Sequence, residues 1–134
     1  MEFCKSKIDL LKEYIYYSDV HDSKIEKAMF NNSDNTVVIW LFNSISKSGY
    51  KMVFGDVKVS LYTMGEFTGY KTVSSLTIEE DYSVLGECFD DDGGMSDYIY
   101  LLFQTASGDE LHIVAKTVCI DKQCCWLFTV KYTV

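Results

Sequence analysis

Short turn-forming patches recur along this chain and separate runs that are rich in β-branched and aromatic residues. The patches are Asn31–Asn35, Ser46–Gly49, Asp90–Gly94, Ala106–Asp109 and Asp121–Gln123. Asn, Asp, Ser and Gly favour turns, whereas Val, Ile, Thr, Tyr, Phe and Trp favour strands. This alternation predicts an antiparallel β fold.

Six runs have the composition of strands: Lys24–Phe30, Thr36–Asn43, Tyr50–Tyr62, Tyr98–Thr105, Glu110–Ile120 and Cys125–Val134. The first two runs predict one hairpin, and the fourth and fifth predict a second. In the third run the apolar phase changes at Gly55-Asp56, which predicts a β-bulge or a bend. Two weaker, shorter strands are expected around Tyr70–Ile78 and Tyr82–Cys88.

One helix is predicted near the N-terminus. Apolar residues at helical spacing form one face of this segment, namely Ile8, Leu10, Leu11, Tyr14, Ile15 and Tyr17. Ser6 and Asp9 have the spacing of a capping box, which predicts the start of the helix. Because a helix of about 12 residues is marginal alone in water, we expect it to dock on an apolar surface of the sheet.

The chain of 134 residues has no proline, no Gly/Ser-rich linker and no internal repeat, so residues 1–134 are expected to form a single domain. We predict an α+β fold in which the N-terminal helix packs on a strongly curved, mostly antiparallel sheet or partial barrel of about six to eight strands. The expected core consists of Ile8, Leu11, Ile15, Val37, Ile39, Leu41, Leu101, Phe103, Ile113, Trp126 and Phe128.

The charge of the chain is strongly acidic, with 20 acidic residues against 12 basic ones, and a net charge of −8. Every basic residue is lysine, so the planar fork with which arginine grips phosphates is missing. We therefore expect no binding to nucleic acid or to anionic membranes. An acidic surface suits a basic protein partner, although net charge also serves solubility.

The densest acidic clusters lie on expected loops, where binding residues usually sit. The predicted partner-binding residues are Glu79, Glu80, Asp81, Asp90, Asp91 and Asp92. A calcium loop is not indicated at the second cluster, since Cys88 and Ile99 would stand where an EF-hand needs acidic ligands. We expect no metal and no cofactor.

The N-terminus lacks the apolar stretch and cleavage site of a secretory signal. The longest apolar run, Val37–Phe42, is too short to span a bilayer. We therefore expect a cytoplasmic protein. Its five cysteines are expected to be free thiols without zinc-site spacing: Cys4, Cys88, Cys119, Cys124 and Cys125.

His21-Asp22 is the sharpest local candidate for catalysis, because Asp22 could orient His21 as a general base. No Gly-framed serine or flanked cysteine supplies a nucleophile beside it. We favour the interpretation that His21, Asp22 and Ser23 hydrogen-bond to backbone groups between the helix and the first strand. We accordingly expect no enzymatic activity.

The segment from His21 to Phe42 contains a His-Asp-Ser-x-Ile entry into a strand, an Asn/Asp turn and an apolar strand. It resembles a loose group of small uncharacterised bacterial β-rich proteins, some of which are thought to be immunity proteins that neutralise secreted toxins. The strand–Ser-Gly-Asp–strand pattern of Tyr98–Ile120 adds to this resemblance. It implies a non-catalytic protein-binding module, and it carries no site residue over to this chain.

The alternative function is that of a small-molecule-binding β-barrel or a weak enzyme with an aromatic pocket near His21 or His112. The interior distinguishes the two functions. A solid core would favour protein binding, whereas a cavity of roughly a few hundred Å³, lined by tyrosines and reached by a histidine, would favour the alternative.

Overall fold

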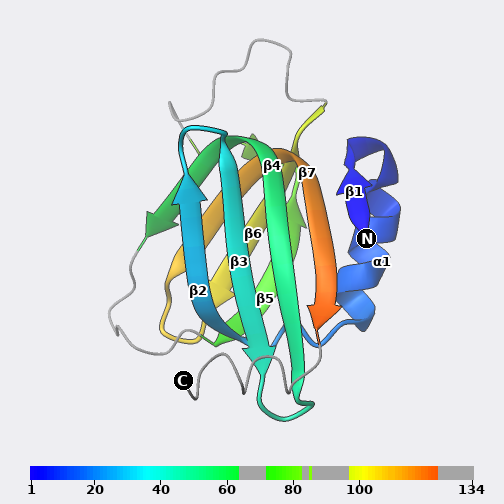
Figure 1. Cartoon of the computed structure of the whole chain (residues 1–134), viewed down its shortest axis with the longest axis vertical. Helices are drawn as coiled ribbons and strands as arrows, with labels where there is room; N and C mark the ends of the chain where they lie inside the picture. Colours follow the sequence, from blue (N-terminus) through cyan, green and yellow to red (C-terminus); the bar gives the residue numbers. More distant parts are fainter. Residues whose placement is uncertain (64–71, 83–84, 86–96, 124–134) are drawn as a thin grey trace.

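The computed structural model describes residues 1–63, 72–82, 85 and 97–123 (Figure 1). Within these residues the chain forms one α-helix, one short 3-10 helix and seven strands. Their bounds are β1 Glu2–Cys4, η1 Lys5–Lys7, α1 Ile8–Tyr17, β2 Lys24–Asn31, β3 Thr36–Asn43, β4 Ser48–Thr63, β5 Val73–Glu79, β6 Ile99–Thr105 and β7 Glu110–Gln123.

The seven strands form one antiparallel sheet in the order β2-β3-β4-β7-β6-β5, and β1 pairs with the C-terminal part of β7. Both predicted hairpins, β2–β3 and β6–β7, are present. The β2–β3 turn is formed by its Asn residues: the Asn31 side chain accepts the N–H of Ser33 at 3.0 Å, and Asn35 has a φ of 55°. The predicted α+β fold is confirmed.

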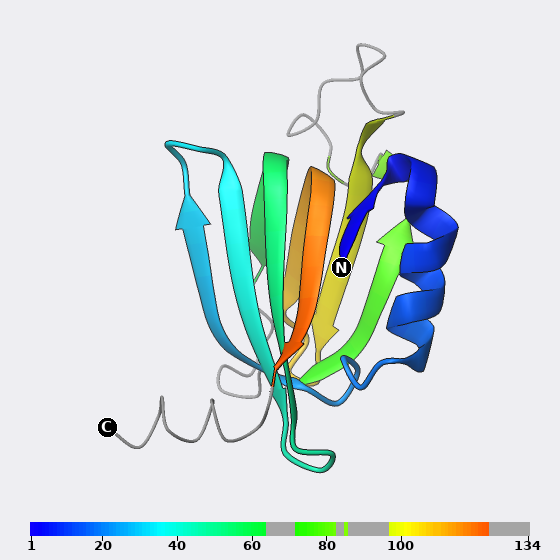
Figure 2. The same ribbon diagram turned by 45° about the vertical axis from the view of Figure 1, so that its right-hand side comes forward.

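The sheet is strongly curved but does not close. One half of the sheet contains β2 and β3, and the other contains β5 and β6, which lie behind them in Figure 1 and on the opposite side in Figure 2. Strands β4 and β7 connect the two halves. The two edges meet at a single corner, where the N–H of Asp22 donates to the carbonyl of Val73 at 2.8 Å. The N–H of Val73 in turn donates to the carbonyl of Ser23 at 2.7 Å.

Strand β4 bends where the sequence predicted it. Met52 and Phe54 of β4 pack in the main core, and the next residue of β4 that contacts this core is Val57. The core-facing residues therefore change from even to odd positions between Phe54 and Val57. Asp56 has a φ of 50° at this point, and the register with β7 shifts immediately afterwards, between Val57 and Val59. The predicted bulge or bend at Gly55-Asp56 is confirmed.

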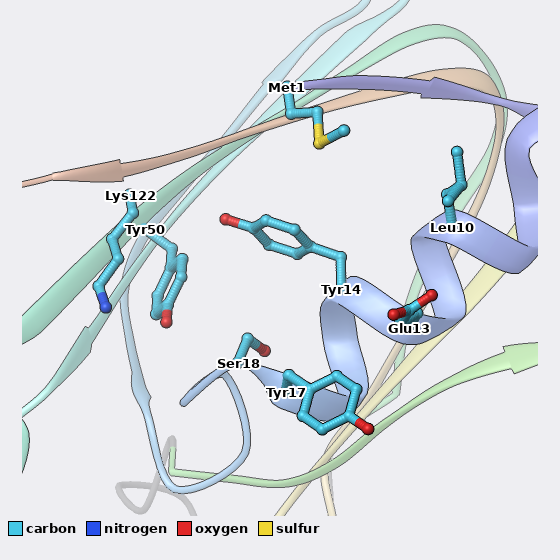
Figure 3. A pocket seen from close by; sticks show the side chains of 8 residues that line it. All are labelled: Met1, Leu10, Glu13, Tyr14, Tyr17, Ser18, Tyr50 and Lys122. Carbon is cyan, nitrogen blue, oxygen red and sulfur yellow. The ribbon is translucent and has the colours of Figure 1, made fainter.

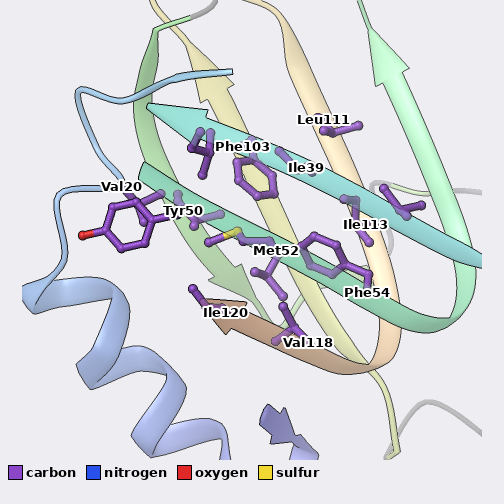
Figure 4. Packing of buried hydrophobic residues seen from close by; sticks show 14 of the residues in the cluster. Val20, Ile39, Tyr50, Met52, Phe54, Phe103, Leu111, Ile113, Val118 and Ile120 are labelled. Atoms are coloured by element: carbon purple, nitrogen blue, oxygen red, sulfur yellow. The ribbon is translucent and has the colours of Figure 1, made fainter. Parts of the chain in front are cut away.

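The main core lies between the two halves of the curved sheet (Figure 4). Seven of the expected core residues are buried: Leu11, Val37, Ile39, Leu41, Leu101, Phe103 and Ile113. Ile8 and Ile15 are only half-buried, and Trp126 and Phe128 lie outside the described residues. A smaller apolar cluster on the opposite face of the sheet contains Val59, Leu85, Tyr100, Leu102 and Val114.

The helix packs on the sheet through a narrower face than predicted. Leu11 is its only buried residue, and Tyr14 contacts Phe3 of β1 with ring centroids 5.6 Å apart. Leu10 and Tyr17 were expected on the docking face but are exposed. The reason is geometric: α1 rests beside β1 and β5 at the rim of the sheet (Figure 2), so only a narrow stripe of it meets the core.

The predicted capping box is wrong. A 3-10 turn precedes α1, no side chain caps the helix, and the Ser6 hydroxyl instead lies 3.0 Å from the Cys4 thiol. Among the residues that the structure describes, no helix is long and apolar enough to cross a membrane.

Several strand boundaries also differ from the prediction. β5 spans Val73–Glu79 and so ends one residue later than the predicted strand Tyr70–Ile78, of which Tyr70 and Lys71 lie outside the described residues. β7 continues to Gln123 through a patch expected to be a turn. Tyr82 and Leu85, the described residues of the predicted strand Tyr82–Cys88, are not in a strand. The predicted last strand, Cys125–Val134, lies outside the described residues.

Gly55 is required where β4 crosses β7, because a Cβ added there would lie 2.6 Å from the Thr117 hydroxyl oxygen. We expect Gly55→Ala to destabilise the fold by about 1–3 kcal/mol, since the Thr117 side chain must rotate or one of the two strands must move to relieve the clash. Chemical denaturation of the two single variants and of Gly55→Ala/Thr117→Ala gives a double-mutant cycle. The double variant should recover most of the loss, and strictly additive effects would contradict the proposed clash.

Ile39 has no exposed surface and lies in the main core, whereas its neighbour Val38 faces the other side of β3 and is half-buried. We expect Ile39→Ala to lower the free energy of unfolding by about 2–5 kcal/mol, because it leaves a cavity. Val38→Ala is the matched control and should cost clearly less. A loss below about half a kcal/mol for Ile39→Ala would place the core elsewhere.

Candidate partner-binding edge and neighbouring cavities

Half of the predicted acidic site lies on one edge of the sheet. Glu79 is the last residue of β5, and Glu80 and Asp81 follow it directly. Glu80 is 82% exposed and lies 3.6 Å from the Lys12 ammonium of α1. Asp90, Asp91 and Asp92 lie outside the described residues, although in sequence they belong to the same β5–β6 connection.

Helix α1 and strand β5 form a shallow groove beside these acidic residues. The groove has a volume of about 170 Å³, and its walls are Ile15 and Tyr16 of the helix and Leu76 and Ile78 of the strand. Lys12 closes it near Glu80. An apolar groove with a carboxylate-rich rim can accept the aliphatic stem and the charged head of a basic side chain.

Tyr16 and Tyr17 form an exposed aromatic pair at the C-terminal end of α1. Their side chains are 77% and 78% exposed, and their rings pack edge to face with centroids 5.0 Å apart. Tyr16 borders the α1–β5 groove, whereas Tyr17 borders a cavity on the other side of the helix. Because consecutive residues of a helix point about 100° apart, α1 forms a ridge between the two hollows.

The second hollow, which we call the tyrosine cavity, is open to solvent like the groove and has a volume of about 400 Å³ (Figure 3). It lies between α1, the start of β1, β4 and β7. Tyr14 and Tyr17 line it from the helix, Tyr50 from β4 and Lys122 from β7. The cavity has the size and the tyrosine lining that the alternative function requires, but no histidine is among its lining residues. The sequence placed such a pocket near His21 or His112 and did not indicate that Tyr14, Tyr17 and Tyr50 would form it.

The two histidines lie away from both hollows. His21 is exposed on the loop between α1 and β2, and its Nε2 atom is 4.0 Å from the Asp22 carboxylate. Of the three residues expected to bond to backbone, Ser23 does so, through its hydroxyl to the carbonyl of Asp19. The backbone N–H of Asp22, rather than its side chain, bonds across to β5.

His112 is buried in a polar network on the face of the sheet opposite the main core. Its Nδ1 atom lies 2.6 Å from the Tyr100 hydroxyl, and its Nε2 atom lies 3.4 Å from Glu110. A tautomer with the proton on Nε2 satisfies both contacts, with Tyr100 donating to Nδ1. Burial, and then the charges of Glu79 and Glu110, raise the pKa of Tyr100 to about 12.

The Tyr100 hydroxyl in this network is protonated at neutral pH and shielded from solvent. Tyr100 has no exposed surface, and a phenol with a raised pKa is a poor nucleophile and a poor base at neutral pH. In the described parts of the chain, no group of three or more His, Cys, Asp or Glu side chains could hold a metal ion. Cys4 and Cys119 are free thiols, and the other three cysteines lie outside the described residues.

In comparisons with known proteins, no protein-family model matches the chain, and no curated protein matches its sequence.

Tyr100→Phe is expected to lower the free energy of unfolding by about 1–3 kcal/mol, because it leaves the buried Nδ1 atom of His112 without its donor. Tyr16→Phe removes the same hydroxyl from an exposed position and should change stability by less than about 0.5 kcal/mol. Urea denaturation of both variants measures the difference. Equal values would show that the Tyr100–His112 hydrogen bond is dispensable.

Proposed function

We propose that this protein is a non-catalytic protein-binding module that recognises a basic partner through the α1–β5 edge. The observation that carries the proposal is the exposed pair Tyr16-Tyr17 standing beside an apolar groove with an acidic rim. Tyrosine is enriched among the residues that dominate binding energy at protein interfaces. Its exposure on a helix, where it contributes little to the core, supports a role in binding.

The charge of this edge favours a basic partner. Glu80 and Asp81 follow the end of β5, and Asp9 lies on the same side of α1 as Lys12 because the two are three residues apart. Glu79 faces the other side of β5, where its carboxylate accepts a hydrogen bond from the Thr77 hydroxyl at 3.3 Å. Carboxylates from both the helix and the end of β5 thus contribute negative charge to this edge. Complementary charges of this kind raise the rate of association and suppress binding to acidic proteins.

An immunity protein that neutralises a basic toxin is the specific form of this function that we propose. Such a protein acts by occluding its target, which requires a rigid surface and no catalytic group. The α1–β5 edge meets the first requirement, since it rests on a sheet with a packed core. Co-expression with the product of a neighbouring toxin gene should then preserve cell growth, and Tyr16→Ala/Glu80→Lys should abolish this protection.

Photo-crosslinking tests the binding function even while the partner is unidentified. A photoreactive phenylalanine analogue is placed at Tyr16 and, as a matched control, at Ile45, which is 85% exposed on the β3–β4 turn. In cells of the source organism, position 16 should give one dominant adduct with a basic protein. Glu80→Gln should reduce its yield, because it removes a charge from the rim of the groove. Glu79→Gln, on the opposite face of β5, should reduce the yield less.

Salt provides the second readout. In cell extracts the yield from position 16 should fall toward that of position 45 at about 1 M salt, where charges are screened beyond about 3 Å. Equal adduct patterns from the two positions, an acidic crosslinked protein, or a yield unaffected by the glutamine substitutions would each contradict the proposal.

A further inference from the structure

The tyrosine cavity lies on the side of α1 away from the acidic edge, and its chemistry differs from that of the edge. Its walls are mostly apolar, formed by Met1, Leu10 and the rings of Tyr14, Tyr17 and Tyr50. A volume of about 400 Å³ lies within the range of small-molecule sites. The tyrosine rings make it suited to a flat apolar group.

Three hydrogen-bond donors line the cavity, Tyr14 from α1, Tyr50 from β4 and Lys122 from β7, with the Tyr50 ring between the other two (Figure 3). Figure 3 shows the Tyr14 hydroxyl pointing toward the side where Tyr50 and Lys122 stand. The Tyr50 oxygen accepts the N–H of Asp19 at 3.1 Å, which leaves its own proton available for donation. Within the described residues, the Tyr14 hydroxyl has no hydrogen-bond partner and the Lys122 ammonium has no ion-pair partner.

The protonation of these groups suits an acceptor. Burial raises the pKa of Tyr14, with smaller effects from Tyr50 and Asp121, so the phenol remains a donor at neutral pH. Two carboxylates lie nearby. Asp121 is close enough to Tyr14 to raise its pKa, but it does not line the cavity and lies 3.4 Å from the N-terminal ammonium. Glu13 lines the cavity on the opposite side of Tyr14 from Lys122 (Figure 3).

We propose that the tyrosine cavity binds a carboxylate attached to a flat apolar group. The carboxylate accepts hydrogen bonds from the Tyr14 hydroxyl and the Lys122 ammonium, and the apolar group packs among Leu10, Tyr17 and Met1. A charge-assisted bond to lysine is among the stronger hydrogen bonds that a protein offers. This site shares Tyr17 with the aromatic pair of the proposed protein-binding surface, but it uses neither Tyr16 nor the acidic residues of the α1–β5 edge. Substitutions at Tyr14 and Lys122 therefore test it separately from the proposed protein-binding function.

Two sources could supply such a ligand: a free aryl-alkyl acid, or the C-terminal carboxylate of a peptide that ends in an aromatic residue. We therefore use 3-phenylpropionate with its neutral amide and the corresponding amine 3-phenylpropylamine. A tetrapeptide that ends in phenylalanine, with a free or an amidated C-terminus, forms the second arm. Binding is measured by NMR titration of the full chain, following the resonances of Tyr14, Tyr17 and Lys122.

We expect the acid to bind with a dissociation constant at least about tenfold below that of its amide, and the amine to bind more weakly still. Lys122→Met should remove this preference for the acid while leaving amide binding unchanged, because it keeps the straight chain and deletes the charge. Tyr14→Phe should weaken acid binding by a smaller factor. Lys7→Met, at the other end of α1, is the charge-matched control and should leave all affinities unchanged.

The outcomes distinguish the two sources. A preference for the acid over the peptide identifies a small-molecule site, and the reverse preference identifies a peptide terminus as the ligand. Equal affinity for acid and amide, or acid binding that survives Lys122→Met, would overturn the proposal. No shift of the cavity resonances with any probe at about 10 mM would also overturn it, since even weak ligands bind detectably at that concentration.

Discussion

The long antiparallel pairing of β4 with β7 holds this structure together. It runs from Gly49 opposite Gln123 to Thr63 opposite Glu110, and every other strand joins the sheet through one of these two or through a neighbour of theirs. Strands of this length cannot stay flat, because each residue adds to the right-handed twist of the sheet. The bend at Gly55-Asp56 concentrates that twist and lets the two halves of the sheet face one another across the main core.

The curvature also decides what α1 does. Since the sheet curls without closing, its rim between β1 and β5 is left open, and the helix covers it there (Figure 2). A helix on a rim buries only a narrow stripe, here centred on Leu11, and exposes both flanks. The two flanks then border different surfaces, an acidic one beside β5 and an aromatic one beside β4 and β7.

The two histidines, His21 and His112, do not line either of these surfaces. His112 is enclosed by Tyr100 and Glu110, and this contact satisfies a histidine that burial would otherwise leave without partners. His21 and Asp22 are exposed on a loop, where solvent surrounds them. The two histidines thus differ in burial, while the candidate binding surfaces consist of exposed tyrosines with carboxylates on one side of α1 and with Lys122 on the other.

The sequence by itself determined the class of the fold. The continuous apolar run of β3, the turn residues around Asn31–Asn35 and Ser107–Asp109, and the helical spacing near the N-terminus each act over a few positions. Local physical chemistry therefore predicts both hairpins and the helix. The phase change at Gly55-Asp56 is local too, which explains why the bend could be predicted.

Only the tertiary structure decided how wide the docking face of α1 is and where its flanks lie. Leu10 and Tyr17 are spaced along α1 as the residues of a buried face would be. They are exposed because the helix lies on the rim of the sheet. Of the acidic clusters, the sequence located Glu79–Asp81, but not the groove beside them. That groove and the tyrosine cavity join residues of α1 to residues of β4, β5 and β7, which are far apart along the chain. Such a juxtaposition depends on the curvature summed over the whole sheet, and no local pattern in the sequence encodes it.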